Sequence, residues 1–386
     1  MVAIPLREGG HTVDLGVEIS PYSADRSSSK DIHPWLTDFE TKVIRADSCL
    51  THCMKLKNKG FSPDAIIAHP GWGESLFLKE IWPGVPLGAY CEFFYAPTGT
   101  DLDFDPEFKT TTLIEDACRI RLKNLNNLLH ENLMDKGISP TRWQASTFPV
   151  SMQKKMTVIH DGIDTEACCP NDAAYVETKS LGRIFKGDEI ITFVSRNLEP
   201  YRGFHVFMRA IPRILAVRPK AKILIVGAEG KGYGALPLDG STWRQRFEKE
   251  LKETAPDLDW TRISFLGTLP YNHFQRVLQV SAVHVYLTYP FVASWSLLEA
   301  MSTGTAIIGS DTPPVKEFVQ NRDTGLLVDF FNHRALAEMV CELLDDDSLR
   351  KRLGRAGREL MQDSYDLNSV CLPRQIEWTE SLTENG

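Results

Sequence analysis

The sequence predicts an α/β protein with two domains, each built on a doubly wound parallel sheet. Three observations lead to this fold class. The chain of 386 residues is long enough for two domains with separate cores. Its hydrophobic content of 42% is ordinary for a globular protein. Runs with strand character alternate with helical runs, and the short turns between them favour parallel strands joined by right-handed crossovers.

The C-terminal half gives the clearer pattern. Strands and helices alternate from 190 to 329, with strands expected at 190–195, 283–288 and 305–309 and helices opening at Gly203 and near Ser296. Two helices should follow Asp345, the last at about 368–382. The strands are continuous apolar runs, as is typical of a sheet covered on both faces.

The N-terminal half has fewer regular runs. Strands are expected at 12–19, 65–68 and 87–94, and long helices at 34–59 and 113–133. A further helix should begin near Glu74, after the turn that contains Gly71 and Gly73. The predicted domains are therefore an N-terminal domain at 1–165, a C-terminal domain at 186–365 and a helix at 366–386 that crosses back.

A phosphate-binding site is predicted in the C-terminal domain. The helix near Ser296 starts at the carboxyl edge of the sheet, where its first amides and its dipole attract an anion. Glu299 lies one turn further on, where its carboxylate could accept hydrogen bonds from hydroxyl groups. Arg196 and Arg202 project from the same edge and could clamp a diphosphate. The alternative for either arginine is an ion pair with Glu199 or another surface acid.

Several motifs resemble one known family. The run LLEAMSTGTAIIGSDTPPVKEFVQNRDTGLLVD resembles the donor-site signature of retaining GT-B glycosyltransferases of family 4. The segment ITFVSRNLEPYRGFHVFMRAIPRIL is similar to the family's strand and arginine loop, with Arg202-Gly203 where Lys-Gly is usual. The resemblance is continuous from about 154 to 372, and it covers the segment MTVIHDGIDTEACCP as the interdomain hinge. It implies a GT-B fold of two Rossmann-like domains with a cleft between them.

The resemblance also assigns residue roles. It implies catalytic roles for His69, Arg196 and Arg202. The residues expected to bind the donor are Gly203, Gly227, Ser294, Trp295, Ser296 and Glu299. One position departs from the family pattern, because Phe291 stands where a first glutamate is usual. The role of that glutamate would be absent in this chain or shared by the backbone amides at 293–295.

In the N-terminal domain, His69 follows a buried strand and precedes the Gly-rich turn. It matches the family histidine that contacts the donor sugar. Glu92, at the end of the next strand, and Trp72 are expected on the acceptor side, although an acid at a strand end is as often an ion-pair partner. The chain opens at Gly10-His11-Thr12-Val13, a turn that the family normally reaches after a first strand and helix. We therefore expect a truncated N-terminal sheet that lacks its first strand beside 12–19.

Composition excludes several other classes. The net charge of −8 argues against general nucleic-acid binding. There is no signal-peptide pattern and no long apolar run, so the default location is the cytoplasm. Two basic clusters are present: Lys55, Lys57 and Lys59, and Arg119, Arg121 and Lys123. They are better explained as solvated helix faces. Peripheral contact with the inner face of a membrane is the alternative.

No metal or other cofactor is expected. The eight cysteines have no paired CxxC units and are interpreted as free thiols. Cys49, His52 and Cys53 lack a fourth ligand. The two DxD patterns, at 101–103 and 257–259, lie in turns unsuited to holding a metal on a nucleotide. The glycines at 227–234 do not have the spacing of a nicotinamide-binding loop.

The predicted activity is transfer of a sugar from a nucleoside-diphosphate sugar to a carbohydrate or lipid-linked acceptor, in polysaccharide or glycoconjugate synthesis. This prediction combines the predicted phosphate-binding site with the family resemblance. Two alternatives stay open. One is a nucleotide-sugar epimerase of the same fold, and the other is a non-catalytic sugar-nucleotide-binding protein.

Overall fold

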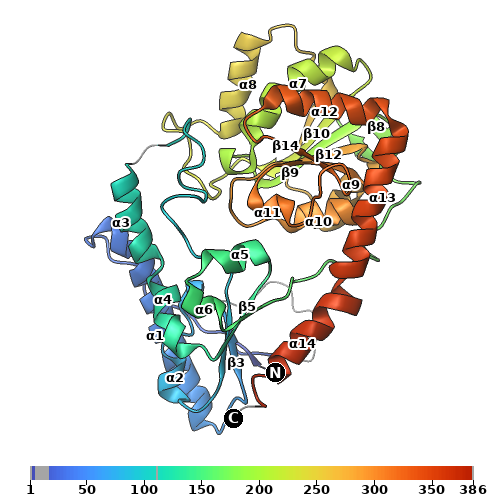
Figure 1. Ribbon diagram of the computed structural model, residues 1–386. Helices are drawn as coiled ribbons and strands as arrows, with labels where there is room; N and C mark the ends of the chain where they lie inside the picture. Colours follow the sequence, from blue (N-terminus) through green and yellow to red (C-terminus); the bar gives the residue numbers. More distant parts are fainter. Residues whose placement is uncertain (1, 5–16, 110–111, 385–386) are drawn as a thin grey trace. The chain divides into compact units, whose positions relative to one another are not determined.

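The computed structural model describes residues 2–4, 17–109 and 112–384 (Figure 1). The chain divides into two compact units. Unit 1 comprises Met1–Asp103, Lys109–His160 and Arg374–Gly386, and unit 2 comprises Phe104–Phe108 and Asp161–Pro373. Five residues, Phe104–Phe108, therefore belong to unit 2 although both flanking segments belong to unit 1.

Unit 2 contains a six-stranded sheet in which every pairing is parallel. The strand order is β11-β10-β9-β12-β13-β14. The first three strands along the chain run outward in one direction and the last three in the other. This order confirms the doubly wound parallel sheet predicted for the C-terminal half. The strands are β9 (Ile190–Asn197), β10 (Lys222–Ala228), β11 (Ile263–Gly267), β12 (Val283–Tyr286), β13 (Ala306–Ser310) and β14 (Leu326–Val328).

Successive residues of each strand enter different cores on the two faces of this sheet. In β9, Ile191 and Phe193 join one cluster, whereas Ile190 and Val194 join the other. This follows from the two-residue period of a strand. Figure 1 shows the two helical layers. Helices α7 (Phe204–Val217), α8 (Trp243–Thr254) and α12 (His333–Asp345) cover the first face, and α9 (Tyr271–Val280), α10 (Trp295–Ser302) and α13 (Asp347–Ser364) cover the second.

The remaining elements of unit 2 are short. An antiparallel hairpin is formed by β7 (Tyr175–Thr178) and β8 (Gly182–Phe185), and α11 (Pro313–Lys316) follows β13. Beyond α13 the chain makes a π-helical turn, Leu367–Cys371, before its last helix.

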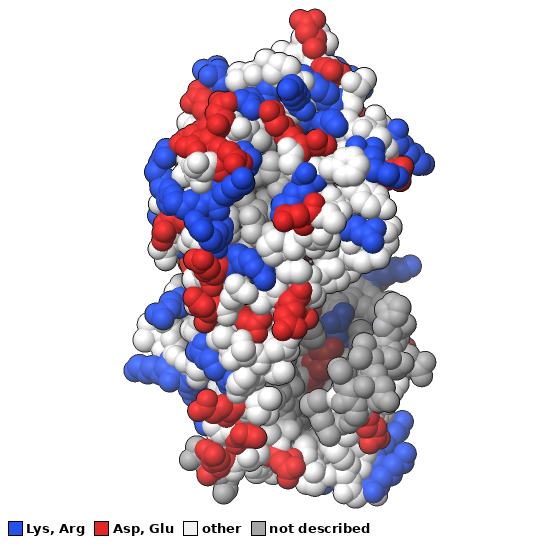
Figure 2. Space-filling view, turned by 90° about the vertical axis from the view of Figure 1, so that its right-hand side faces the viewer, with Lys and Arg blue, Asp and Glu red and all other residues white. Residues whose placement is uncertain are grey.

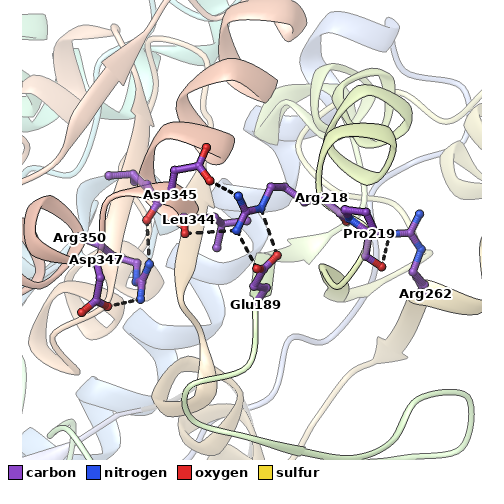
Figure 3. Close-up of polar contacts among 9 residues, drawn as sticks. Glu189, Arg218, Pro219, Arg262, Leu344, Asp345, Asp347 and Arg350 are labelled. Carbon is purple, nitrogen blue, oxygen red and sulfur yellow. Dashed lines mark hydrogen bonds and ion pairs between the residues drawn. The ribbon is translucent and has the colours of Figure 1, made fainter.

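Arginines stabilise the end of unit 2 from which β9 starts. The Arg218 guanidinium, just after α7, pairs with Glu189 before β9 at 2.7 Å and also contacts Asp345 at the end of α12 (Figure 3). Arg262 donates to the carbonyl oxygen of Leu215, in the last turn of α7, and to that of Pro219, just beyond α7. These cations satisfy carbonyl groups that a helix terminus leaves open. The cluster lies at the amino end of β9, so the carboxyl edge of the sheet is free for function.

Unit 1 has a smaller parallel sheet in the order β3-β4-β5-β6. Its strands are β3 (Ile66–Ala68), β4 (Leu87–Tyr90), β5 (Lys136–Ser139) and β6 (Met156–Val158). The strand predicted at 12–19 is described only in part, because 5–16 lie outside the described residues. Among the described residues, β2 (Glu18–Ile19) pairs with β1 (Val2–Ala3) in a separate two-stranded sheet. The strand at 12–19 was predicted to lack a neighbour on one side, but β2 has this short one.

The helices of unit 1 differ from the prediction at two places. The predicted helix at 113–133 is two helices, α3 (Leu113–Lys123) and α4 (Leu125–Leu133), which meet at Asn124. The side chain of Asn124 bonds to the backbone N–H and C=O of Tyr95. No helix begins near Glu74, because Gly73 adopts a left-handed conformation (φ 100°) after a short 3₁₀ turn, Pro70–Trp72. The other helices are α1 (Thr37–Asn58), α2 (Leu78–Ile81), α5 (Arg142–Thr147) and α6 (Val150–Gln153).

The C-terminal helix α14 (Leu372–Glu380) packs on the sheet of unit 1. Trp378 and Leu382 share a small core with Ile138 and Ile159. A Cβ on Gly88 would lie 2.7 Å from the Trp378 ring, so this glycine lets the helix approach β4 closely. Among the described helices, none has the length and apolar character needed to cross a membrane.

Candidate functional site

The carboxyl edge of the unit 2 sheet contains a topological switch point between β9 and β12. These strands are hydrogen-bonded neighbours, yet β9 leads into α7 on one face and β12 leads into α10 on the other. Diverging connections leave a crevice beyond the strand ends, which is where open α/β sheets bind ligands. The sequence-predicted donor residues come from these two connections.

The start of α10 gathers three of the predicted residues. Ser294 is the N-cap, and its hydroxyl accepts from the backbone N–H of Ser296 at 3.4 Å. The backbone N–H of Ser294 donates to the Tyr286 hydroxyl at 2.6 Å, so this amide already has a partner. Trp295 is 57% exposed and its indole N–H donates to Asp161. The helix dipole favours an anion at this end.

Arg196 and Arg202 lie in different surroundings. The side chain of Arg196, the second-last residue of β9, is exposed and forms no hydrogen bond or ion pair with any described residue. Arg202 is 6% exposed, and its Nη1 donates to the Tyr286 and Thr288 hydroxyls and to the carbonyl oxygen of Val292. Arg202 therefore braces the loop between β12 and α10, while Arg196 is available to a ligand.

Gly203 and Gly227 have packing roles at this edge. Gly203 has a φ of 68°, and a Cβ on it would lie 2.4 Å from that of Leu287. A Cβ on Gly227 would lie 2.8 Å from the carbonyl oxygen of Ser195. Both glycines let backbone segments at the strand ends approach one another.

Glu299 is held by a residue that the sequence did not indicate. Its Oε1 accepts a hydrogen bond of 2.7 Å from the hydroxyl of Tyr271, the first residue of α9. The Glu299 side chain is 8% exposed, and burial raises the pKa of its carboxyl group against the opposing effect of the Tyr271 hydrogen bond. The Tyr271 hydroxyl also lies 3.3 Å from Cys168 Sγ. Oε2 is the carboxylate oxygen left for a ligand hydroxyl.

Glu199 organises the glycine-rich loop after β10. Neither arginine forms an ion pair with it; its two carboxylate oxygens accept from the backbone N–H groups of Tyr233 and Gly234, at 3.1 and 2.9 Å. A Cβ on Gly232 would lie 2.1 Å from the carboxylate, so only glycine fits there. The carboxylate is 2% exposed and burial raises its pKa. The sequence showed these glycines but not the acid that anchors them.

Phe291 occupies an aromatic cluster and is 6% exposed. Its ring lies edge-on to Tyr233 at 4.9 Å and to Tyr201 at 6.1 Å. The guanidinium of Arg202 lies 5.2 Å from the Tyr233 ring. At the position where the family pattern has a glutamate, the chain therefore has an apolar contact between two loops.

A second group of predicted residues meets in unit 1. His69 Nε2 lies 3.1 Å from Glu92 Oε2, and the His69 ring stacks on Trp72 at 4.7 Å. A carboxylate only accepts, so Nε2 carries the proton and Nδ1, which has no partner among the described residues, faces the buried side. A Cβ on Gly71 would lie 2.8 Å from the ring, so glycine makes room for it. Trp72 is 59% exposed.

The described residues include no group of three or more potential metal ligands. Cys49 and Cys53 are 4.0 Å apart, and His52 bonds instead to the hydroxyl of Ser20. All eight cysteines are free thiols.

The basic clusters are partly used inside the fold. Lys57 donates to the carbonyl oxygen of Ile81, and Arg119 pairs with Asp116. The Lys123 ammonium lies 3.5 Å from the Tyr95 ring centre, and burial lowers its pKa to about 8. On the face shown in Figure 2, basic and acidic side chains are interspersed among uncharged residues.

Two family models match the chain, one for each half. The model described as "Glycosyl transferase family 4 group" matches residues 2–168, and the model described as "Glycosyl transferases group 1" matches residues 178–360. Together they cover both units and the switch point.

Named relatives and solved structures agree with these matches. The chain is 26% identical over 241 residues to the phosphatidyl-myo-inositol mannosyltransferase of Mycolicibacterium smegmatis, covering 61% of this chain and 54% of that protein. It is 28% identical over 204 residues to the D-inositol 3-phosphate glycosyltransferase of Corynebacterium glutamicum, covering 52% and 46%. The chain thus spans about half the length of these relatives. The structure of Anabaena Alr3699/HepE in complex with UDP and glucose shares the fold, with a TM-score of 0.64, 15% identity and coverage of 95% and 86%.

Proposed function

This chain belongs to the group 1 glycosyltransferases of family 4, and we propose that it transfers a sugar from a nucleoside-diphosphate sugar to a carbohydrate or lipid-linked acceptor. The observation that carries the proposal is the switch point of unit 2. There an exposed arginine without a described partner, a helix amino terminus and a buried carboxylate converge on one sheet edge. This combination matches the charges and hydroxyls of a nucleoside diphosphate.

Each group at the edge would bind one part of the donor. Arg196 and the first turn of α10 stabilise the diphosphate, and their contribution grows as negative charge develops on it. Glu299 Oε2 accepts from a ribose hydroxyl. Arg202 contributes to donor binding indirectly, since its hydrogen bonds hold the loop that leads into α10.

Transfer with retention would proceed without a protein nucleophile. The bond between the anomeric carbon and the diphosphate oxygen breaks, and the acceptor oxygen bonds to that carbon on the same face. The acceptor proton passes to the departing phosphate oxygen. In unit 1, the Glu92 carboxylate orients His69, and Trp72 offers an apolar surface to a sugar ring.

The chemistry named for similar proteins supports this substrate class. Two relatives are named phosphatidyl-myo-inositol mannosyltransferase and D-inositol 3-phosphate glycosyltransferase, and the name of a third includes GDP-mannose-dependent. A structure of the same fold was solved with UDP and glucose. We extend to this chain the nucleotide-sugar donor and, as the first acceptor to test, an inositol headgroup.

A non-catalytic sugar-nucleotide-binding protein is the second candidate. It is favoured by Phe291, which fills the glutamate position with an apolar contact and offers a donor sugar no carboxylate. In that case the donor would bind at the same edge without turning over.

Turnover of a donor panel tests the proposal. The full chain would be incubated with UDP-glucose, UDP-N-acetylglucosamine or GDP-mannose, with and without phosphatidylinositol vesicles, in excess EDTA. We expect release of UDP or GDP from one donor, and an α-linked product by proton NMR. Binding without release would support the binding protein, and epimerised donor would support an epimerase. Activity lost in EDTA and restored by magnesium or manganese would contradict the metal-free mechanism.

A further inference from the structure

The segment Phe104–Phe108, here called the strap, is built into unit 2 by several side chains. Glu107 forms a bidentate ion pair with Arg209 of α7, with both N–O distances at 2.7 Å. The Phe108 ring packs on Trp243 at 5.0 Å, and the Phe104 ring packs on Phe330 at 5.1 Å. The strap is thus anchored at both ends and in the middle.

Asp105 is the buried centre of the strap. It is 5% exposed, and its Oδ2 lies 2.6 Å from the hydroxyl of Tyr289 and 3.2 Å from His205 Nε2. Its Oδ1 accepts from the backbone N–H of Glu107. A buried carboxylate is retained only where hydrogen bonds replace its lost water, and here three donors do so. Tyr289 and His205 are themselves 3% and 1% exposed.

The two side chains bound by Asp105 belong to the two connections that form the switch point. His205 is in the first turn of α7, three residues after Arg202. Tyr289 is in the loop between β12 and α10, three residues after Tyr286. The backbone N–H of Tyr289 also donates to the carbonyl oxygen of Tyr201 at 3.0 Å. Asp105 therefore links the start of one connection to the loop of the other.

We propose that Asp105 is a positioning residue for the donor site, which fixes the loop between β12 and α10 through the Tyr289 hydroxyl. This inference rests on the proposed function, because the loop matters only if the donor binds there. Asp105 does not reach the ligand in this account. It sets the place from which the amino terminus of α10 faces the diphosphate. The donor site of unit 2 then depends on a segment whose flanking sequence belongs to unit 1.

The chain offers a matched control within the strap. Asp105→Asn removes the charge that strengthens the hydrogen bond from Tyr289, and Tyr289→Phe removes the hydroxyl that donates it, so both weaken the link to the loop. Glu107→Gln removes a charge from the same strap, but its partner is Arg209, which does not contact the loop. Release of the strap as a whole would affect all three variants, whereas loss of loop positioning would affect only the first two.

Two measurements on the full chain test the proposal. In amide hydrogen exchange without ligand, residues 289–297 should exchange faster in Asp105→Asn and Tyr289→Phe than in wild type, and at the wild-type rate in Glu107→Gln. In calorimetric titration with UDP and with GDP, the same two variants should bind the preferred nucleotide about three- to tenfold more weakly, as expected for one lost hydrogen bond. The double variant should be no weaker than the weaker single variant, because both changes break one link.

The outcomes separate this inference from the proposed function. Wild type that binds neither nucleotide would contradict the proposed function, while the exchange measurement would still report on the loop. Wild-type exchange of residues 289–297 in both variants would overturn the positioning role. Equal weakening in Glu107→Gln would overturn it as well, since the strap would then act only as a general support of the fold.

Discussion

Arg196 and Arg202 show how two neighbouring arginines can have different tasks at one sheet edge. The guanidinium of Arg196 is exposed and has no partner among the described residues, whereas that of Arg202 is buried and donates three hydrogen bonds. The first arrangement leaves the full charge for a ligand. The second uses it to hold the protein together.

Arg196→Ala should weaken donor binding and leave the fold intact. One charge-assisted contact to the diphosphate would be lost, worth about 1.5–3 kcal/mol, or roughly a 10- to 150-fold rise in Kd. Calorimetry with UDP or GDP measures this, and a thermal melt should show an unchanged Tm. Arg183→Ala, which removes an exposed charge from the hairpin at β8, is the control. Equal affinity of wild type and Arg196→Ala would contradict the diphosphate contact.

Arg202→Ala should lower both stability and donor affinity. From the sequence alone we expected the fold to survive this change, but the structure shows that three acceptors would lose their buried donor. Unsatisfied buried groups cost about 1–3 kcal/mol each. A fall in the free energy of unfolding, measured by urea titration, is therefore expected together with the loss of binding. An unchanged urea midpoint would show that the bracing contacts contribute nothing.

Glu299→Gln should affect a nucleotide more than a simple anion. The amide keeps the size of the side chain but loses the anionic acceptor, so affinity for UDP or GDP should fall while affinity for pyrophosphate should not. Burial raises the pKa of Glu299, and the carboxylate form binds the hydroxyl, so wild-type nucleotide affinity should decrease as pH falls through this raised pKa. Titrations from pH 7 downward measure both effects. Equal losses for nucleotide and pyrophosphate would exclude the hydroxyl contact.

The sequence predicted which residues meet at the edge but not what holds them. Glu299 and Arg196 follow from a strand–loop–helix pattern, which is local. Their supports are distant in sequence, since Tyr271 is 28 residues from Glu299 and Asp105 is 184 residues from Tyr289. A tyrosine at a helix start and an aspartate in a polar loop have no periodic signal. Only the folded chain brings them to these positions.

At the level of elements, strands that are apolar along their whole length were the most predictable. The strands β9 and β12 were expected at 190–195 and 283–288, and in the structure they span Ile190–Asn197 and Val283–Tyr286. Contacts distant in sequence were harder to predict. The side chain of Asn124, between α3 and α4, bonds to the backbone of Tyr95, which helical periodicity cannot show.

Asp366 should make the end of unit 2 sensitive to acid. Burial raises the pKa of its carboxyl group, but hydrogen bonds from Ser369 and Thr165 outweigh this and hold it at about 2. Because the folded pKa lies below the unfolded value of about 3.9, this contribution to stability is complete above pH 4 and is lost as pH falls from about 4 to 2. Thermal melts from pH 7 to 3 should show a smaller fall in Tm for Asp366→Asn than for wild type. Asp363→Asn, an exposed position, should follow wild type, and parallel curves for all three would contradict the linkage.

For the whole molecule, the two units divide the predicted chemistry. Unit 2 contains the residues predicted to bind the nucleotide, and unit 1 contains the group of His69, Glu92 and Trp72. The sequence indicated both groups because each follows a strand end of a parallel sheet. It did not show that five residues from the middle of the N-terminal half belong to the core of unit 2. Such an exchange depends on contacts between side chains and leaves no trace in hydrophobic periodicity.

Amide hydrogen exchange of the full chain with saturating UDP or GDP shows where the nucleotide binds. We predict slower exchange at 196–204 and 286–299, the two connections that leave the switch point of unit 2. The Arg196→Ala variant should lose this protection at the same nucleotide concentration. Protection confined to other segments, such as the His69 turn at 69–74, would contradict nucleotide binding at the switch point.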